Sequence, residues 1–161
     1  MKPLVAILMG SDSDADYLKA CGEVLRNFGI AFEAKVLSAH RTPRDTVAYV
    51  KAAKKKGVRI FICAAGGAAH LAGVVAAYTE LPVIGIPVET VSLKGLDSLL
   101  STVQMPAGTP VATVAVGSAG VRNAAFLAAR ILALNNTKLE KALLKYKEDN
   151  RQKVLSKKVE L

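Results

Sequence analysis

The chain has 161 residues, of which 52% are hydrophobic and 22% charged, and its net charge is +9. This length suits one compact domain, and this composition excludes a disordered chain. Trp is absent and aromatic residues make up only 5%, so the core must consist of Ala, Val, Ile and Leu. Such a core favours β/α layers over an aromatic-rich β-sandwich.

Short apolar runs alternate with helical patterns along most of the chain. In chain order we expect a strand over 4–9, a helix ending at Gly29, a strand over 32–37, a helix from Pro43 to Lys56 with Thr42 as its cap, a strand over 59–65, a helix over 68–78, a strand over 82–86, a short helix over 96–102, a strand over 111–116 and a helix over 121–134. Continuous apolar runs are typical of parallel strands that are covered on both faces. The βαβ order with short links predicts an α/β protein with a doubly wound parallel sheet.

The C-terminal segment 136–158 is charged but keeps a thin apolar stripe. Leu139, Leu143, Tyr146, Asn150 and Val154 follow helical spacing. This pattern predicts an extra helix that either closes the domain or packs on another subunit. No linker or internal repeat interrupts the chain, so we expect a single domain over 1–161 with its core over 4–134.

The positive charge makes a nucleic-acid partner the first binding class to test. The tail 137–161 holds eight Lys and Arg against four Asp and Glu. No aromatic residues interleave with the remaining positive charges as a stacking platform would require. We therefore expect no nucleic-acid partner, and an anionic small substrate or solubility explains the charge equally well.

Two uncharged stretches, 60–79 and 98–121, are long enough to span a membrane. Both are interrupted by glycine, and the second also contains Pro106 and Pro110, so we predict buried strand–loop–helix units and no membrane partner. Cys21 and Cys63 form no CxxC pair, which favours a reducing compartment. We expect a cytoplasmic protein.

Three unusual loops follow predicted strands, at 10–14, 38–43 and 65–71. Ligands of open parallel sheets gather at the carboxyl ends of the strands, so these loops are expected to form one site. In the first loop, Gly10, Ser11 and Ser13 precede a helix, where backbone N–H groups favour an anion. The alternative is a plain helix cap made by Ser11 or Ser13. One of the nearby carboxylates, such as Asp14, can instead accept hydrogen bonds from ribose hydroxyls.

The second loop places His40 beside Arg41. Histidine suits acid–base chemistry near neutral pH, and the planar guanidinium of arginine suits phosphate. The alternatives are a loop histidine bonded to backbone and a solvated charge.

The third loop runs from Ala65 through Gly66 and Gly67 to His70 and Leu71. Its small residues expose backbone N–H groups to an anion or a carboxyl oxygen, or they serve tight strand–helix packing. His70 is a candidate substrate contact or a partly buried, hydrogen-bonded histidine. Two histidines without an HExxH spacing or clustered Cys predict no metal site.

Five segments follow one another along the chain in a distinctive order. They are Met9-Gly10-Ser11-Asp12-Ser13-Asp14, Ser38-Ala39-His40-Arg41-Thr42-Pro43, Gly66-Gly67-Ala68-Ala69-His70-Leu71, Gly95-Leu96-Asp97-Ser98-Leu99 and Val103-Gln104-Met105-Pro106. Together they resemble one known family, the N5-carboxyaminoimidazole ribonucleotide mutases, or PurE family. The resemblance covers residues 4–134. Ala64 and Ala72 depart from it, because the family usually has Gly and Pro at these positions.

The resemblance implies a flavodoxin-like three-layer domain that assembles as a homo-octamer. It implies that the enzyme, an isomerase of purine biosynthesis, moves a carboxyl group from N5 to ring C4 of the ribonucleotide without metal or organic cofactor. By the same resemblance, Ser11 and Arg41 bind the phosphate, Asp14 binds the ribose and His40 is the general acid and base. Gly10, Ser13 and Ser38, together with Ala65, Gly66, Gly67, His70 and Leu71, complete the expected substrate site.

Two other functions remain open beside the mutase. One is the carboxylase branch of the same family, which uses free carbon dioxide and typically has Lys after the loop histidine and Arg-Ser-Asn in the third loop. Arg41 and the sequence from Gly66 to His70 favour the mutase. The other is a non-enzymatic binding or signalling domain of similar architecture, for which the third strand, ending in Cys63-Ala64-Ala65-Gly66, lacks the acidic residue that a phosphorylated receiver needs.

Overall fold

A computed structural model describes residues 2–159 of the chain. Its elements, in order, are β1 (Val5–Met9), the 3₁₀-helix η1 (Asp12–Asp14), α1 (Ala15–Asn27), β2 (Phe32–Val36), α2 (Pro43–Lys56), β3 (Ile60–Gly66), α3 (Leu71–Ala77), β4 (Val83–Val88), α4 (Leu96–Val103), β5 (Ala112–Thr113), α5 (Ser118–Ala133) and α6 (Thr137–Leu155). All strand pairs are parallel, and the sheet order is β2-β1-β3-β4-β5. This is the flavodoxin-like order, in which the chain reverses its direction of winding between β1 and β3.

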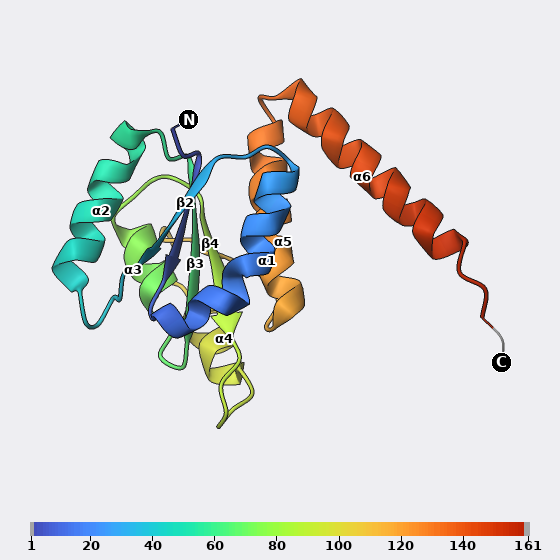
Figure 1. Cartoon of the computed structure of the whole chain (residues 1–161). Coiled ribbons are helices and arrows are strands. Elements are labelled where there is room, and N and C mark those ends of the chain that lie inside the picture. The colour runs from blue at the N-terminus through green and yellow to red at the C-terminus, as the bar shows by residue number, and fades with distance from the viewer. Residues whose placement is uncertain (1, 160–161) are drawn as a thin grey trace.

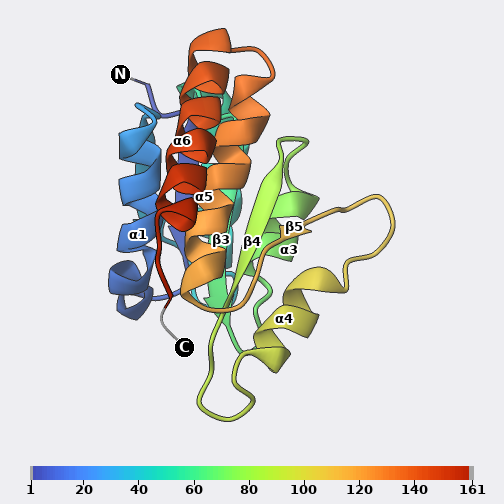
Figure 2. The ribbon, with the colours of Figure 1, turned by 90° about the vertical axis from the view of Figure 1, so that its right-hand side faces the viewer.

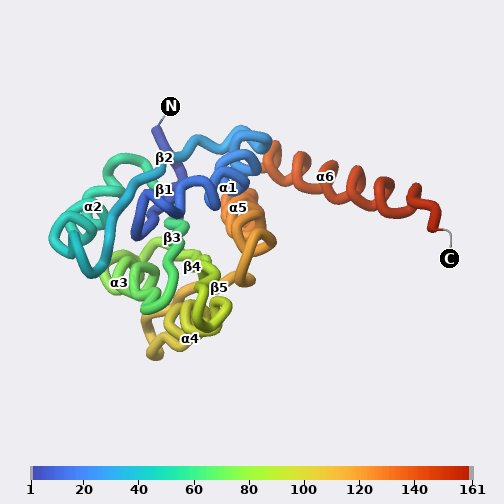
Figure 3. The backbone as a smooth tube through the Cα atoms, turned by 60° about the horizontal axis from the view of Figure 1, so that its bottom comes forward, coloured from blue at the N-terminus to red at the C-terminus, as the bar shows by residue number. Residues whose placement is uncertain are grey.

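Helices cover both faces of the sheet and make three layers (Figure 1, Figure 2). Figure 3, which brings the carboxyl edge of the sheet forward, shows α2 and α3 on one side and α1 and α5 on the other. β1 is buried along its whole length because it lies between β2 and β3 and under helices on both faces. The predicted doubly wound sheet is confirmed.

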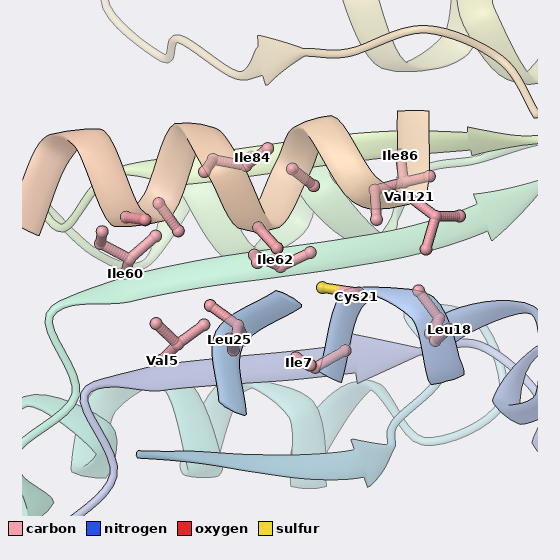
Figure 4. Close-up of a cluster of buried hydrophobic side chains, with 14 of the residues drawn as sticks. Val5, Ile7, Leu18, Cys21, Leu25, Ile60, Ile62, Ile84, Ile86 and Val121 are labelled. Carbon is pink, nitrogen blue, oxygen red and sulfur yellow. The ribbon is translucent and has the colours of Figure 1, made fainter. Parts of the chain in front are cut away.

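Alternate residues of each central strand point to opposite faces of the sheet and pack in two separate cores. Val5, Ile7 and Met9 point toward α1 and α5, together with matching residues of β3 and β4 (Figure 4). Ala6 and Leu8 point the other way, toward α2 and α3. The small side chains of Ala124, Ala125, Ala128 and Ala129 face the core and let α5 lie close to the sheet. The prediction that the core consists of Ala, Val, Ile and Leu is wrong at Phe61, which is fully buried, and at Tyr49, which packs in the same core.

Three predicted boundaries are wrong. β5 has only two residues instead of six, because after Val114 donates to the carbonyl of Gly85 the chain leaves β4 and turns. α5 begins at Ser118 instead of 121, because the preceding Gly117 has a positive φ of 86° and its carbonyl accepts from the first turn. α3 begins at Leu71, since the preceding residues 68–70 form a turn. The other predicted strands and α4 agree within one or two residues.

The C-terminal segment forms the predicted extra helix, α6, which extends away from the sheet in Figure 1. The first part of its apolar stripe packs on the domain: Leu139 is buried, and the ring of Tyr146 lies 4.8 Å from Phe126 and 5.9 Å from Phe28. The end of the stripe does not pack, because Val154 is 60% exposed. The stripe therefore anchors α6 at one end and leaves the other end uncovered.

Candidate functional site at the carboxyl edge of the sheet

The three predicted loops converge on one pocket of about 390 Å³ at the carboxyl ends of β1, β2 and β3. This volume falls within the range of small-molecule sites. The residues that line the pocket are Gly10, Ser11, Asp14, Ser38, Ala39, His40, Arg41, Ala65, Gly66, Ala68, His70 and Leu71. Of the twelve residues expected at the site, ten line this pocket, and Ser13 and Gly67 do not.

The first loop joins β1 to α1 and presents polar groups to the pocket. The Ser11 hydroxyl accepts from the backbone N–H of Ser13 at 3.3 Å, so Ser11 makes the predicted cap, here on η1. Ser13 itself is exposed outside the pocket. A side chain at Gly10 would meet no protein atom within 4 Å, which leaves that side of the loop open to a ligand.

The second loop is held by its own hydroxyl groups. The Ser38 hydroxyl accepts from the N–H of Arg41 at 3.1 Å, while the Thr42 hydroxyl accepts from the N–H of Ser38 at 2.9 Å. Thr42 occupies the N-cap position of α2, but its side chain makes no capping bond. Thr42 therefore has the predicted position but not the predicted capping bond, because its hydroxyl is hydrogen-bonded to the backbone of Ser38.

Arg41 connects the second loop to the first. Its Nη2 donates a hydrogen bond to the carbonyl oxygen of Gly10, so the guanidinium joins two loops that line the pocket. Asp14 also lies within reach of this positive charge. Partial burial raises the pKa of the Asp14 carboxyl above its ordinary value of 3.8, and a backbone hydrogen bond at Ser11 and the charge of Arg41 only partly offset this effect.

The two histidines of the chain meet in this pocket. Nε2 of His40 lies 2.9 Å from Nδ1 of His70, and their ring planes stand at 86° to each other. Both side chains are exposed on the pocket wall. His70 is therefore hydrogen-bonded, as the alternative interpretation expected, but it is exposed and not partly buried, and its partner is His40. The pair offers a proton donor and acceptor to a ligand between the loops.

The third loop is shaped by a residue that the sequence did not single out. Gly67 has φ of +65°, and its N–H donates to the hydroxyl of Ser98 at 2.9 Å. This N–H is consequently unavailable to a ligand, contrary to the expectation for Gly67. Ser98 belongs to the segment from Gly95 to Leu99, which carried the family resemblance but no assigned role. Ala39 and Ala68, which line the pocket, were also missed because alanine carries no chemical signal.

Within residues 2–159 no three His, Cys, Asp or Glu side chains come together as a metal-binding group. In the same part of the chain, no helix combines the length and hydropathy needed to cross a membrane.

The fold is that of an α/β protein, and its pocket lies at the carboxyl ends of β1 and β3, where the winding of the sheet reverses. The family model described as AIR carboxylase matches residues 4–153. The N5-carboxyaminoimidazole ribonucleotide mutase of Saccharolobus solfataricus is 52% identical over 158 residues, covering 98% of this chain and 99% of that protein. The mutase of Bacillus subtilis is 48% identical over 155 residues, covering 96% of each. The chain belongs to the AIR carboxylase family, and the resemblance stated for its loops is confirmed.

Solved structures agree with this assignment. The crystal structure of Treponema denticola PurE2-S38D matches with a TM-score of 0.87 and 32% sequence identity, covering 96% of this chain and 95% of that one. The crystal structure of Treponema denticola PurE matches with a TM-score of 0.86 at the same identity. The Saccharolobus solfataricus and Bacillus subtilis relatives are named mutases, so the family membership supports an isomerase-type enzyme over a signalling domain.

Proposed function

We propose that the chain is an N5-carboxyaminoimidazole ribonucleotide mutase of purine biosynthesis, which moves the carboxyl group from N5 to ring C4. The observation that carries this proposal is the convergence of His40, His70, Arg41 and Asp14 on one pocket. These groups match what the substrate demands: a phosphate ligand, a ribose ligand and a proton carrier.

The first two loops bind the ribonucleotide in this proposal. Arg41 and Ser11 bind the phosphate, since a planar guanidinium and a neighbouring hydroxyl both donate hydrogen bonds to an anion. Asp14 accepts hydrogen bonds from the ribose hydroxyls. The open face of Gly10 admits the ligand between these side chains.

His40 moves the proton. As the bond between the exocyclic nitrogen and the carboxyl carbon breaks, protonated His40 gives its proton to that nitrogen and carbon dioxide is released within the pocket. Ring C4 then attacks the carbon dioxide, a new C–C bond forms, and His40 takes the proton that C4 loses. The proton count closes over the cycle and there is no net oxidation or reduction, so the step as written needs no oxidant or reductant.

His70 supports this cycle through its hydrogen bond to His40. The 2.9 Å contact fixes the His40 ring, and the small residues of the third loop leave room for the released carbon dioxide. Holding the reactants together in this way is worth about 7–11 kcal/mol of barrier in well-oriented systems.

The carboxylase reaction of the same family is the second candidate. Arg41, where that branch typically has Lys, and the loop from Gly66 to His70 favour the mutase. To decide, the purified protein is given either the N5-carboxylated ribonucleotide or aminoimidazole ribonucleotide with bicarbonate, and product is followed by absorbance. Fast product formation from the carboxylated substrate alone supports the mutase. Comparable rates from bicarbonate assign the chain to the carboxylase branch, and no product from either overturns the proposal.

We further propose a homo-octamer in the cytoplasm. Large apolar side chains remain exposed on two helices, at Leu96, Leu100 and Val103 of α4 and at Val154 and Leu155 of α6, and an assembly would cover them. Both Cys21 and Cys63 are free thiols, which suits a reducing compartment. Light scattering should give eight times the 16.9 kDa chain mass, and a monomer would contradict the assembly.

A further inference from the structure

We propose that Ser98 and Ser101 of α4 are positioning residues that hold the third loop in its working shape, an inference that rests on the mutase function proposed above. Neither serine lines the pocket. Both hydroxyls nevertheless reach the backbone of Gly67, at the centre of that loop.

Ser98 is completely buried, and both hydrogen-bonding capacities of its hydroxyl are used. Its oxygen accepts from the N–H of Gly67 at 2.9 Å, and its proton goes to the carbonyl of Val88 at 2.6 Å. The single hydroxyl thus joins the third loop to the end of β4. The bond is partly buried, and a backbone N–H that is shielded from water loses stability when its partner is removed, so this contact constrains the loop.

Ser101, one helical turn after Ser98, contacts the backbone carbonyl of Gly67. Its hydroxyl is 3.2 Å from the Gly67 carbonyl oxygen and 2.7 Å from that of Asp97 in its own helix. Gly67 adopts φ of +65°, a left-handed conformation that glycine reaches without the steric cost of a Cβ. Within the turn itself the hydrogen bonds are short-range: the N–H of Ala69 donates to the carbonyl of Gly67, and the N–H of His70 donates to the carbonyl of Ala68.

The start of α4 is itself fixed. The Thr90 hydroxyl donates to the Asp97 carboxylate at 2.8 Å and accepts from the N–H of Gly95 at 3.3 Å. Ser98 follows directly after Asp97, so the backbone that carries its hydroxyl is held in place by these bonds. The chain of contacts runs from Thr90 through α4 to Gly67 and ends at His70, three residues beyond.

The consequence is a selective loss of catalytic rate. In the proposed site the ribonucleotide is bound by the first two loops, whereas the third loop surrounds the migrating carboxyl group and carries His70. Releasing Gly67 should therefore lower kcat and leave KM nearly unchanged.

The test compares Ser98→Ala with Thr102→Val in the assembled enzyme. Thr102 is also buried in α4, but its hydroxyl donates only to the Ser98 carbonyl inside the helix, so the valine variant weakens α4 without touching Gly67. We expect Ser98→Ala to lose about tenfold or more in kcat with KM within about threefold, and Thr102→Val to keep wild-type kcat. Ser98→Thr, which keeps the hydroxyl, should restore much of the rate.

Hydrogen exchange at the Gly67 amide supplies a readout that does not depend on the substrate. We expect slow exchange in the wild type and in Thr102→Val, and fast exchange in folded Ser98→Ala. Unchanged exchange and kcat in Ser98→Ala would overturn the proposal, as would an equal loss of kcat in Thr102→Val. If Ser98→Ala does not fold, Ser101→Ala must show the same split between kcat and KM. If the wild-type protein turns over neither substrate, the mutase function is contradicted. The comparison of hydrogen exchange at the Gly67 amide would still test whether Ser98 holds the third loop.

Discussion

Nε2 of His40 and Nδ1 of His70 are separated by 2.9 Å, although the two residues lie on loops that follow different strands. One of these nitrogens must carry a hydrogen and the other must accept it. The tautomers of the two rings are therefore linked, and a change at either ring alters the orientation of the other.

Replacing His70 tests whether this contact matters. We expect His70→Asn to lower kcat by about 10–100-fold, because His40 loses the partner that fixes its ring, while the affinity for the ribonucleotide stays close to wild type. Steady-state kinetics and calorimetric titration with the product separate the two effects. A kcat within twofold of wild type would show that His40 works without the pair.

Arg41→Lys tests the phosphate ligand and the tie between loops. Lysine keeps the positive charge but cannot present a planar fork to phosphate while also donating to the Gly10 carbonyl. We expect the affinity for the ribonucleotide to fall by about tenfold or more. The matched control is Arg44→Lys, an exposed arginine in the first turn of α2 that does not line the pocket. Equal effects of the two changes would contradict the role of Arg41.

The raised pKa of Asp14 predicts a pH dependence of stability. Burial disfavours the carboxylate, so the folded chain binds this proton more tightly than the unfolded chain, whose carboxyl titrates near 3.8. The protonated carboxyl therefore contributes to the free energy of unfolding below pH 3.8. This contribution is lost as the pH rises from 3.8 through the raised pKa of Asp14 in the folded state.

Asp14→Asn replaces the carboxyl with an uncharged amide, so the variant does not lose the stability that the wild type loses when Asp14 ionises. We expect its Tm to exceed that of the wild type at neutral pH, with the difference shrinking as the pH falls toward 3.8. The same variant should bind ribonucleotide more weakly, because the amide replaces a charged acceptor. Thermal melting across pH checks the first expectation, and a Tm below wild type at neutral pH would refute it.

Gly120 is required by packing at the start of α5. A Cβ at this position would collide with the backbone carbonyl of Ala115, which cannot move as a side-chain tip can. We expect Gly120→Ala to destabilise the fold by about 1–3 kcal/mol. Ala119→Ser, at the neighbouring exposed position, should leave the denaturation midpoint unchanged. A stable Gly120→Ala protein would mean that α5 can shift at little cost.

The sequence predicts those parts of the fold that depend on continuous burial. Residues 4–9 read as a parallel strand because every side chain is apolar, and β1 is indeed buried on both faces. Residues 111–116 also read as a strand, but Ala112 is exposed and pairing with β4 ends after Thr113, so hydrophobicity alone overestimated β5.

The pocket likewise has features that can be predicted from the sequence and features that cannot. Its three loops are predictable because parallel strands place their carboxyl ends together. The contact between Ser98 and Gly67 is not, since a serine in a short helix looks like a surface residue and its partner lies 31 positions away. Likewise, Thr42 has the residue type of a helix cap, and only the folded loop shows that Ser38 occupies its hydroxyl.

The central claim is that His40 carries the proton during carboxyl migration, and His40→Asn tests it most directly. Turnover of the N5-carboxylated ribonucleotide is measured beside calorimetric binding of the product to the same preparation. The account predicts that turnover falls by at least about 100-fold while binding remains, because Asn fills much of the same space but cannot exchange a proton near neutral pH. Near-normal turnover in a variant that binds the ribonucleotide would contradict it.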